Sequence, residues 1–170
     1  MLFIVTGGTI DKLPVYLADG SFDNDSKKFG ESHLPEMLDK ARYLGDRTIE
    51  QVCMLDSLDM VDEMREKIQD VISKSDDNKV IITHGTDTMS ETARFLKKVL
   101  PRNEKCIVLT GAMVPYSVGE KSEALFNLGN AIAYVQTLQP GVYIVMNGRA
   151  FDADNVRKDV ELGVFTTLNP

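Results

Sequence analysis

The sequence has little of the residues that mark several specialised classes of protein. It contains two cysteines and six prolines in 170 residues, too few for a disulfide-stapled scaffold or a proline-rich linker. No stretch of about 18 apolar residues occurs, so the sequence predicts no membrane-spanning helix. A chain of this length buries roughly 70% of its unfolded surface, so one domain can fold without such staples.

Positively charged residues are fewer than negatively charged ones. The chain has 19 lysines and arginines against 26 aspartates and glutamates, a net charge of −7 and a pI near 4.8. A nucleic-acid-binding surface needs clustered lysine and arginine, and an anionic membrane surface attracts the same residues. The composition therefore argues against nucleic-acid and membrane partners. A small zwitterionic substrate stays compatible, because a local site can differ from the net charge.

Both cysteines, Cys53 and Cys106, lie in apolar runs typical of buried strands. We interpret them as free core thiols in the reducing cytoplasm, with a disulfide or a metal site as the alternative. His33 and His84 are too far apart in the chain to suggest a local metal motif, and we expect neither a metal nor a cofactor. The apolar start, residues 1–5, lacks a basic segment and a cleavage site, so we expect a strand rather than a signal peptide.

Apolar segments alternate with segments of helical periodicity along the whole chain. This alternation predicts a single α/β domain, in which helices cover both faces of a mostly parallel sheet in three layers. We expect small β pieces in the polar tail that follows Gly148. The predicted strands cover residues 2–5, 48–55, 79–83, 105–110 and 142–146, and the predicted helices cover residues 34–43, 59–73, 86–99 and 122–138.

A long polar segment, residues 11–31, follows the first predicted strand. It contains Pro14, Gly20 and Gly30 and has no apolar periodicity. Loops of this length are unusual in compact domains and are commonly lids or binding loops. We therefore expect a mobile loop that closes over a ligand.

Small, hydroxyl and acidic residues follow almost every predicted strand. Ligands of doubly wound sheets bind at the carboxyl ends of the strands, where the strand order reverses. The segments that reach this edge are residues 6–9, 56–57, 84–88, 111–113 and 147–148. Their convergence predicts a binding or catalytic site there.

The first of these segments, residues 6–9, reads Thr-Gly-Gly-Thr. Its two glycines allow a tight turn and a close approach of backbone to ligand, and Thr9 can present its hydroxyl for attack. A plain turn is one alternative. A phosphate-binding loop is another, but the lysine and the full glycine spacing of that motif are missing.

The segment 84–89 reads His-Gly-Thr-Asp-Thr-Met and opens a predicted helix. Thr86 or Asp87 can serve as an ordinary N-cap, but the amides of a helix N-terminus also favour an oxyanion or a carboxylate. We expect a structural hydrogen-bonding role for His84. Lys158 is either a solvated lysine or an activating one, and the second role requires partial burial against a carboxylate.

Taken together, these motifs resemble a known family. Residues 6–10 and 84–89 are similar to the two signature motifs of bacterial-type L-asparaginases and glutaminase-asparaginases. Residues 108–115 and 126–128 resemble the next strand and helix of that family, and residues 145–158 resemble the segment of its catalytic lysine. The resemblance spans the chain in one order. It implies a flavodoxin-like or Rossmann-like domain that resembles the family's N-terminal domain.

The resemblance implies catalytic roles for five residues. Thr9 is the expected nucleophile, which attacks a side-chain amide carbon and gives an acyl-enzyme that water hydrolyses. Thr86, Lys158 and Asp87 are the expected second group, in which the amine helps to move a proton from a hydroxyl. Tyr16 lies in the loop where the family carries a tyrosine beside the nucleophile.

The resemblance also implies how a substrate binds. Ser57 and Asp87 are expected to bind the α-carboxylate and the α-ammonium of an amino acid. The backbone of Ala112 is expected to accept a hydrogen bond from the leaving amide, and the backbones of Gly8 and Gly85 are expected to lie against the substrate.

Three departures from the family pattern bear on function. Leu58 stands where longer members carry glutamine, Val114 stands where many carry arginine, and Pro170 falls at the end of the family's first domain. We therefore expect a single domain over residues 1–170 without the family's second domain, and a homo-oligomer of at least two chains. The expected reaction is hydrolysis of L-asparagine to L-aspartate and ammonia. A glutaminase, a broader ω-amidase, and a catalytically weak amino-acid-binding or regulatory module are the alternatives.

Overall fold

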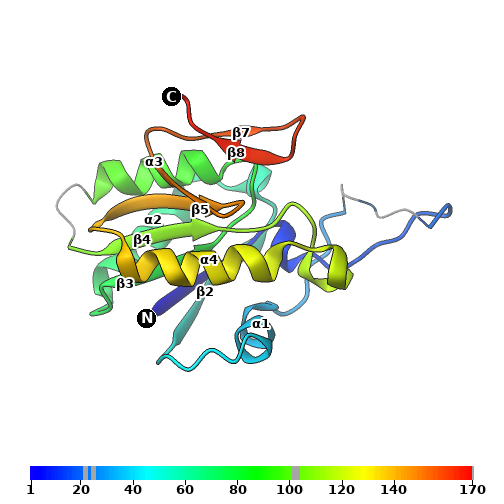
Figure 1. Ribbon diagram of the computed structural model, residues 1–170, viewed down its shortest axis with the longest axis horizontal. Coiled ribbons are helices and arrows are strands. Elements are labelled where there is room, and N and C mark those ends of the chain that lie inside the picture. Colours follow the sequence, from blue (N-terminus) through cyan, green and yellow to red (C-terminus); the bar gives the residue numbers. More distant parts are fainter. Residues whose placement is uncertain (21–22, 24–25, 101–103, 170) are drawn as a thin grey trace.

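The chain folds around one six-stranded sheet with the strand order β2-β1-β3-β4-β5-β6 (Figure 1). The computed structural model describes residues 1–20, 23, 26–100 and 104–169. The first five strands of the sheet are parallel, and β6 is antiparallel to β5. The strands are β1 (Leu2–Gly7), β2 (Thr48–Leu55), β3 (Lys79–Thr83), β4 (Cys106–Thr110), β5 (Gly141–Met146) and β6 (Arg149–Asp152).

Helices cover both faces of this sheet, which confirms the predicted three-layer α/β fold (Figure 1). They are α1 (Leu34–Lys40), α2 (Asp62–Lys74), α3 (Met89–Val99) and α4 (Ala124–Thr137). Leu2 and Ile4 pack with α2 and α3 on one face, whereas Phe3 and Val5 pack with α1 and α4 on the other. A strand buried on both faces reads as a continuous apolar run, and β1 is such a strand.

Short elements complete the fold beside the carboxyl ends of the strands. They are the 3₁₀ helices η1 (Thr9–Asp11), η2 (Ser57–Asp59) and η3 (Tyr116–Lys121), and the strands β7 (Arg157–Asp159) and β8 (Val164–Thr166). Strands β7 and β8 pair as an antiparallel hairpin. Together with β6, they are the small β pieces predicted after Gly148.

Helix α3 begins three residues later than predicted, at Met89 instead of Thr86. Its N-cap residue is Thr88, so the alternative that made Thr86 or Asp87 an N-cap is wrong. The hydroxyl of Thr88 instead donates to the carbonyl of Ser57 at 2.7 Å. The backbone over these residues is therefore shaped by contacts with neighbouring turns and not by the helix.

The start of the predicted loop differs from the expectation. Asp11 belongs to η1, and both Asp11 and Lys12 are buried. One carboxylate oxygen of Asp11 accepts from the Ser32 hydroxyl at 3.0 Å and from the His33 amide at 2.7 Å. Lys12 pairs with Phe29 in an isolated antiparallel bridge. These contacts hold the two ends of the segment together. The hydrogen bonds to Asp11 also supply partners that a buried carboxylate needs.

Both cysteines are free thiols, as predicted. Cys106 is buried and Cys53 is half-buried, and burial raises the pKa of each thiol to about 11. None of the helices formed by the described residues is long and apolar enough to cross a membrane.

Candidate active site

The order in which the strands are added to the sheet reverses direction between β1 and β3. Strand β1 lies between β2 and β3, and the chain winds outward from this pair in both directions. In such sheets the crevice for ligands opens at the carboxyl ends of the strands on either side of the switch. The turns that follow β1 and β3, which carry Thr9 and Thr86, therefore meet at the expected position of a site.

Glycine backbone brings these turns into direct contact. A Cβ atom on Gly8 would overlap the backbone of His84 and Gly85, and a Cβ atom on Gly85 would lie 2.6 Å from both Cβ and Oγ of Ser57. Gly8 also has a φ of 79°, which L side chains rarely adopt. The turns after β1, β2 and β3 thus interlock, and this contact holds Thr9, Ser57 and Thr86 in one region.

Gly8→Ala should therefore destabilise the fold more than a matched change at Gly119. The backbone of Gly119 has nearly the same φ, 78°, but a Cβ atom there would meet open space. We expect Gly119→Ala to cost about 1–3 kcal/mol from backbone strain alone, and Gly8→Ala to cost about 1–3 kcal/mol more from the overlap. Urea unfolding of both variants measures the difference. Equal losses would show that the contact between the turns has little energetic weight.

Lys158 joins this region from β7, far away in the chain. Its Nζ donates to Oγ1 of Thr86 at 2.8 Å and to Oδ1 of Asp87 at 2.6 Å. The Lys158 side chain is 17% exposed and that of Asp87 is 45% exposed. The interpretation of Lys158 as a solvated lysine is wrong, and the geometry predicted for an activating lysine is confirmed.

Two asparagines to which the sequence assigned no role of their own support the β7–β8 hairpin. The Asn127 side chain donates to the carbonyl of Gly111 and accepts from the Asn147 amide, both at 3.0 Å. The Asn147 side chain in turn accepts from the amide of Phe165, which lies opposite Lys158 in the hairpin. These bonds tie the end of β4 and the end of β5 to β8, which pairs with the strand that carries Lys158.

A second charged pair, close in the chain to predicted site residues, was not predicted from the sequence. Lys12 and Asp56 form an ion pair of 2.8 Å with side chains 6% and 10% exposed. Burial opposes ionisation of Asp56, but the bonds from Lys12 and from the Leu58 amide outweigh it, so the pKa of Asp56 lies below its usual value. Lys12 follows Thr9 by three residues and Asp56 precedes Ser57. The pair therefore links the turns that carry two of the predicted site residues. No local sequence pattern predicts this ion pair.

The remaining predicted residues differ in burial. Ser57 and Ala112 are buried, and Thr9 is half-buried at the start of η1. Tyr16 is 60% exposed, so its place beside Thr9 stays a prediction. Within the part of the chain that the structure describes, no three histidine, cysteine, aspartate or glutamate side chains gather as a metal site would require.

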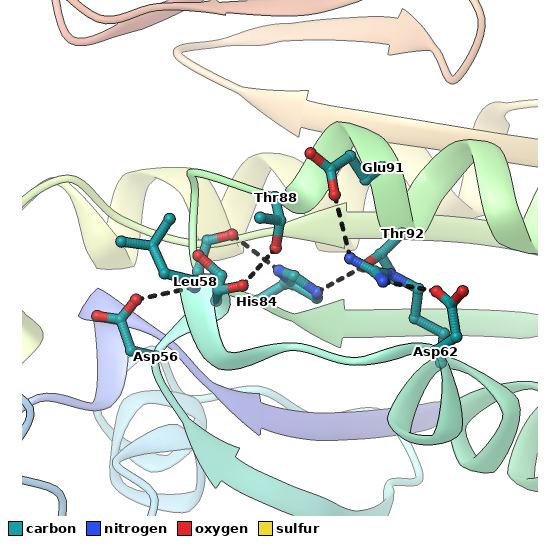
Figure 2. A network of polar contacts seen from close by, with 10 residues as sticks. Asp56, Leu58, Asp62, His84, Thr88, Glu91 and Thr92 are labelled. Atoms are coloured by element: carbon teal, nitrogen blue, oxygen red, sulfur yellow. Dashed lines mark hydrogen bonds and ion pairs between the residues drawn. The ribbon is translucent and has the colours of Figure 1, made fainter.

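His84 lies buried behind the site and makes two hydrogen bonds (Figure 2). Its Nδ1 lies 2.8 Å from the carbonyl oxygen of Gly85, and its Nε2 lies 2.9 Å from Oγ1 of Thr92. Burial, with the charge of Arg65 as a smaller contribution, lowers the pKa of His84 to about 4. The predicted hydrogen-bonding role of His84 is confirmed.

This pKa predicts a stability change in weak acid. In the unfolded chain His84 gains a proton below its usual pKa of 6.5, whereas in the folded protein it stays neutral down to about pH 4. Stability should therefore be lost as the pH falls from 6.5 to 4, by about 3 kcal/mol in total. Chemical denaturation at a series of pH values measures this loss.

A glutamine variant assigns the loss to His84. His84→Gln should flatten the slope between pH 6.5 and 4. Asp11 acts in the opposite direction, because burial raises its pKa, but it is present in both proteins and leaves the comparison intact. Parallel curves for wild type and His84→Gln would contradict the assignment.

A family model described as "Asparaginase, N-terminal" matches residues 1–164 of this chain. The chain is 34% identical over 180 residues to the protein named probable L-asparaginase periplasmic of Haemophilus influenzae, covering 98% of this chain and 48% of that one. It is 29% identical over 174 residues to the glutaminase-asparaginase of Acinetobacter glutaminasificans, covering 95% of this chain and 50% of that one.

The fold agrees with these matches. The solved structure of the thermostable L-asparaginase from Thermococcus kodakarensis is similar with a TM-score of 0.78 and 26% identity, covering 99% of this chain and 51% of that chain. The chain thus spans about half the length of the curated relatives it matches. With a family model over nearly its whole length and the two signature turns in contact, the chain belongs to the asparaginase family, whose N-terminal domain it matches.

Proposed function

We propose that this chain hydrolyses the side-chain amide of L-asparagine to L-aspartate and ammonia. The observation that carries the proposal is the contact of the Lys158 amine with Thr86 and Asp87, at the edge of the sheet where the Thr9 turn packs against Gly85. A hydroxyl, an amine and a carboxylate in contact are a means of moving a proton to or from a nucleophile. Membership of the asparaginase family supports the choice of an amide as the substrate.

In the first half of the reaction, the Thr9 hydroxyl attacks the amide carbon. A bond forms between Oγ1 of Thr9 and that carbon, the carbon–nitrogen bond breaks, and the hydroxyl proton leaves with the nitrogen as ammonia. Thr86 and Lys158 assist the proton transfer, and Asp87 keeps the amine in place. In the second half, water adds to the acyl carbon, Thr9 regains its proton and aspartate leaves.

The same region can bind the amino-acid part of the substrate. The Asp87 carboxylate is half exposed, so it can accept a substrate ammonium while it holds Lys158. Ser57 is proposed to bind the α-carboxylate. The backbones of Gly8, Gly85 and Ala112 are proposed to line the reacting amide, with Tyr16 closing over Thr9 from the loop.

L-Glutamine is the alternative substrate, because a relative that covers 95% of this chain is named glutaminase-asparaginase. Leu58, where longer family members carry glutamine, is 68% exposed beside Ser57. Its side chain brings no hydrogen-bonding group to the substrate, and this loss bears on affinity more than on chemistry.

Ammonia release by the purified chain from L-asparagine and from L-glutamine tests the proposal. We expect faster release from asparagine. Faster release from glutamine would replace the proposed substrate and keep the reaction. Binding of aspartate without ammonia release from either amide would favour the amino-acid-binding module instead.

We further propose a homo-oligomer that works in the cytoplasm. Several apolar side chains are exposed, among them Leu58, Val160 and Leu162 at 68%, 78% and 74%, and contact with a second copy would remove such surface from water. Two free cysteines suit a reducing compartment. Sedimentation of the purified protein tests the first part, and a strictly monomeric species would contradict it.

A further inference from the structure

A row of hydrogen bonds runs from helix α2 to the Gly85 turn, outside the groups proposed to react (Figure 2). The Nε of Arg65 donates to Oγ1 of Thr92 at 3.1 Å. The same Oγ1 lies 2.9 Å from Nε2 of His84, whose Nδ1 lies 2.8 Å from the carbonyl oxygen of Gly85. The row therefore connects three elements: α2, α3 and the turn after β3.

The direction of each bond in this row follows from the chemistry of its ends. The carbonyl oxygen of Gly85 only accepts, so Nδ1 of His84 must carry the proton. Since the ring is neutral, Nε2 is then an acceptor, and Thr92 must donate to it. The guanidinium of Arg65 only donates, and it occupies an acceptor site of the Thr92 oxygen. One arrangement of hydrogens satisfies the row, from Arg65 through Thr92 and His84 to Gly85.

The residues of this row are buried, so water has little access to their hydrogen bonds. Thr92 and His84 are buried at 0% exposure, and Arg65 is 7% exposed. The guanidinium is balanced by Asp62 at 2.8 Å and Glu91 at 3.3 Å, whose carboxylates reach solvent. A buried donor or acceptor that loses its partner is unfavourable, so the row resists rearrangement at any single bond.

The row ends on the peptide bond that joins Gly85 to Thr86. A peptide unit is planar and trans, so its carbonyl and its N–H point in opposite directions. A bond from His84 to the carbonyl of Gly85 therefore also sets the direction of the Thr86 N–H and the origin of the Thr86 side chain. The Thr86 side chain carries the hydroxyl to which Nζ of Lys158 donates at 2.8 Å.

We propose that Arg65, Thr92 and His84 are positioning residues that hold the Gly85–Thr86 peptide in its working orientation. They act through Thr86 and do not touch the substrate. The inference rests on the proposed amidase function for its kinetic consequence. It does not rest on that function for the proton arrangement, which can be measured in a protein without activity.

The first test is the proton arrangement in the wild-type protein. ¹⁵N–¹H correlation spectra of the imidazole rings distinguish a proton on Nδ1 from one on Nε2. The chain has two histidines, so a His33→Gln variant assigns the spectrum of His84. We expect one neutral form at pH 7, with the proton on Nδ1. A proton on Nε2, or a mixture of the two forms, would overturn the proposal whatever the activity.

The second test compares two changes at Thr92. Thr92→Val keeps the shape of the side chain and removes the hydroxyl, whereas Thr92→Ser keeps the hydroxyl. We expect Thr92→Val to lower kcat about ten- to a hundred-fold, since small misplacements of reacting groups have effects of this size. KM should change little, and Thr92→Ser should stay near the wild type. A folded Thr92→Val protein with wild-type kcat would refute the positioning role.

A third measurement separates this proposal from the proposed function. The Thr86 amide resonance should shift in Thr92→Val and stay in place in Thr92→Ser, because only the first variant frees the Gly85–Thr86 peptide. If the wild type releases no ammonia but this contrast holds, the amidase function fails and the positioning row stands. If the Thr86 resonance is the same in both variants, the row does not orient that peptide.

Discussion

Thr9→Ala should leave a folded protein that releases ammonia from L-asparagine at least ~10³-fold more slowly than the wild type. The side chain is half-buried at the start of η1 and belongs to neither core cluster, so its loss removes little packing. Its hydroxyl is the proposed nucleophile, and without it no acyl-enzyme can form. Steady-state ammonia release together with a thermal melt measures both halves of this expectation.

Two further variants test the role of the Thr9 hydroxyl. Thr9→Ser keeps a hydroxyl in the same turn and should retain far more activity than the alanine variant. Thr86→Ala should lose activity to a similar extent as Thr9→Ala, and the double variant little more, because members of one catalytic unit do not act additively. Near-full activity in Thr9→Ala would eliminate the threonine mechanism while leaving the fold and the family assignment untouched.

Lys158→Met should give the second large effect, a loss of about 10²–10⁴-fold in kcat, which is the usual contribution of a positioned acid–base group. Methionine keeps most of the length of the side chain and removes the amine that contacts Thr86 and Asp87. Thr86 then keeps its hydroxyl but loses the group that moves its proton. The measurement is kcat at saturating L-asparagine.

Lys97 offers a matched control for this change. Its amine also pairs with aspartates, Asp152 and Asp154, at 2.6 and 2.8 Å, but it lies on α3 outside the proposed site. Lys97→Met should leave kcat unchanged and alter stability by about 1 kcal/mol or less, as expected of an exposed pair. If both methionine variants lost activity alike, the effect would come from the fold and not from the amine.

Much of the architecture could be read from local patterns. Apolar runs such as those within residues 79–83 and 105–110 predicted the buried parallel strands, because a strand covered by helices on both faces leaves no polar side. Periodic segments predicted four helices, although three of them begin two or three residues later than expected. At Thr86 the reason is specific. The residues that would form the first turn of α3 are held by Lys158 and by Ser57, and these partners are invisible in a local window.

The sequence by itself determined the fold class, the glycine turns and the residue types at the carboxyl ends of the strands. These properties are encoded locally, in periodicity and in the backbone freedom of residues such as Gly8. No local pattern placed the Lys158 amine beside Thr86, 72 residues away; the resemblance to a family implied that contact, and the tertiary structure shows it. The tertiary structure alone pairs Lys12 with Asp56. It also places Nδ1 of His84 within hydrogen-bonding distance of the Gly85 carbonyl oxygen. The physical reason is that the burial of a charge or an imidazole depends on partners supplied by distant strands, and no spacing in the sequence records which of them meet.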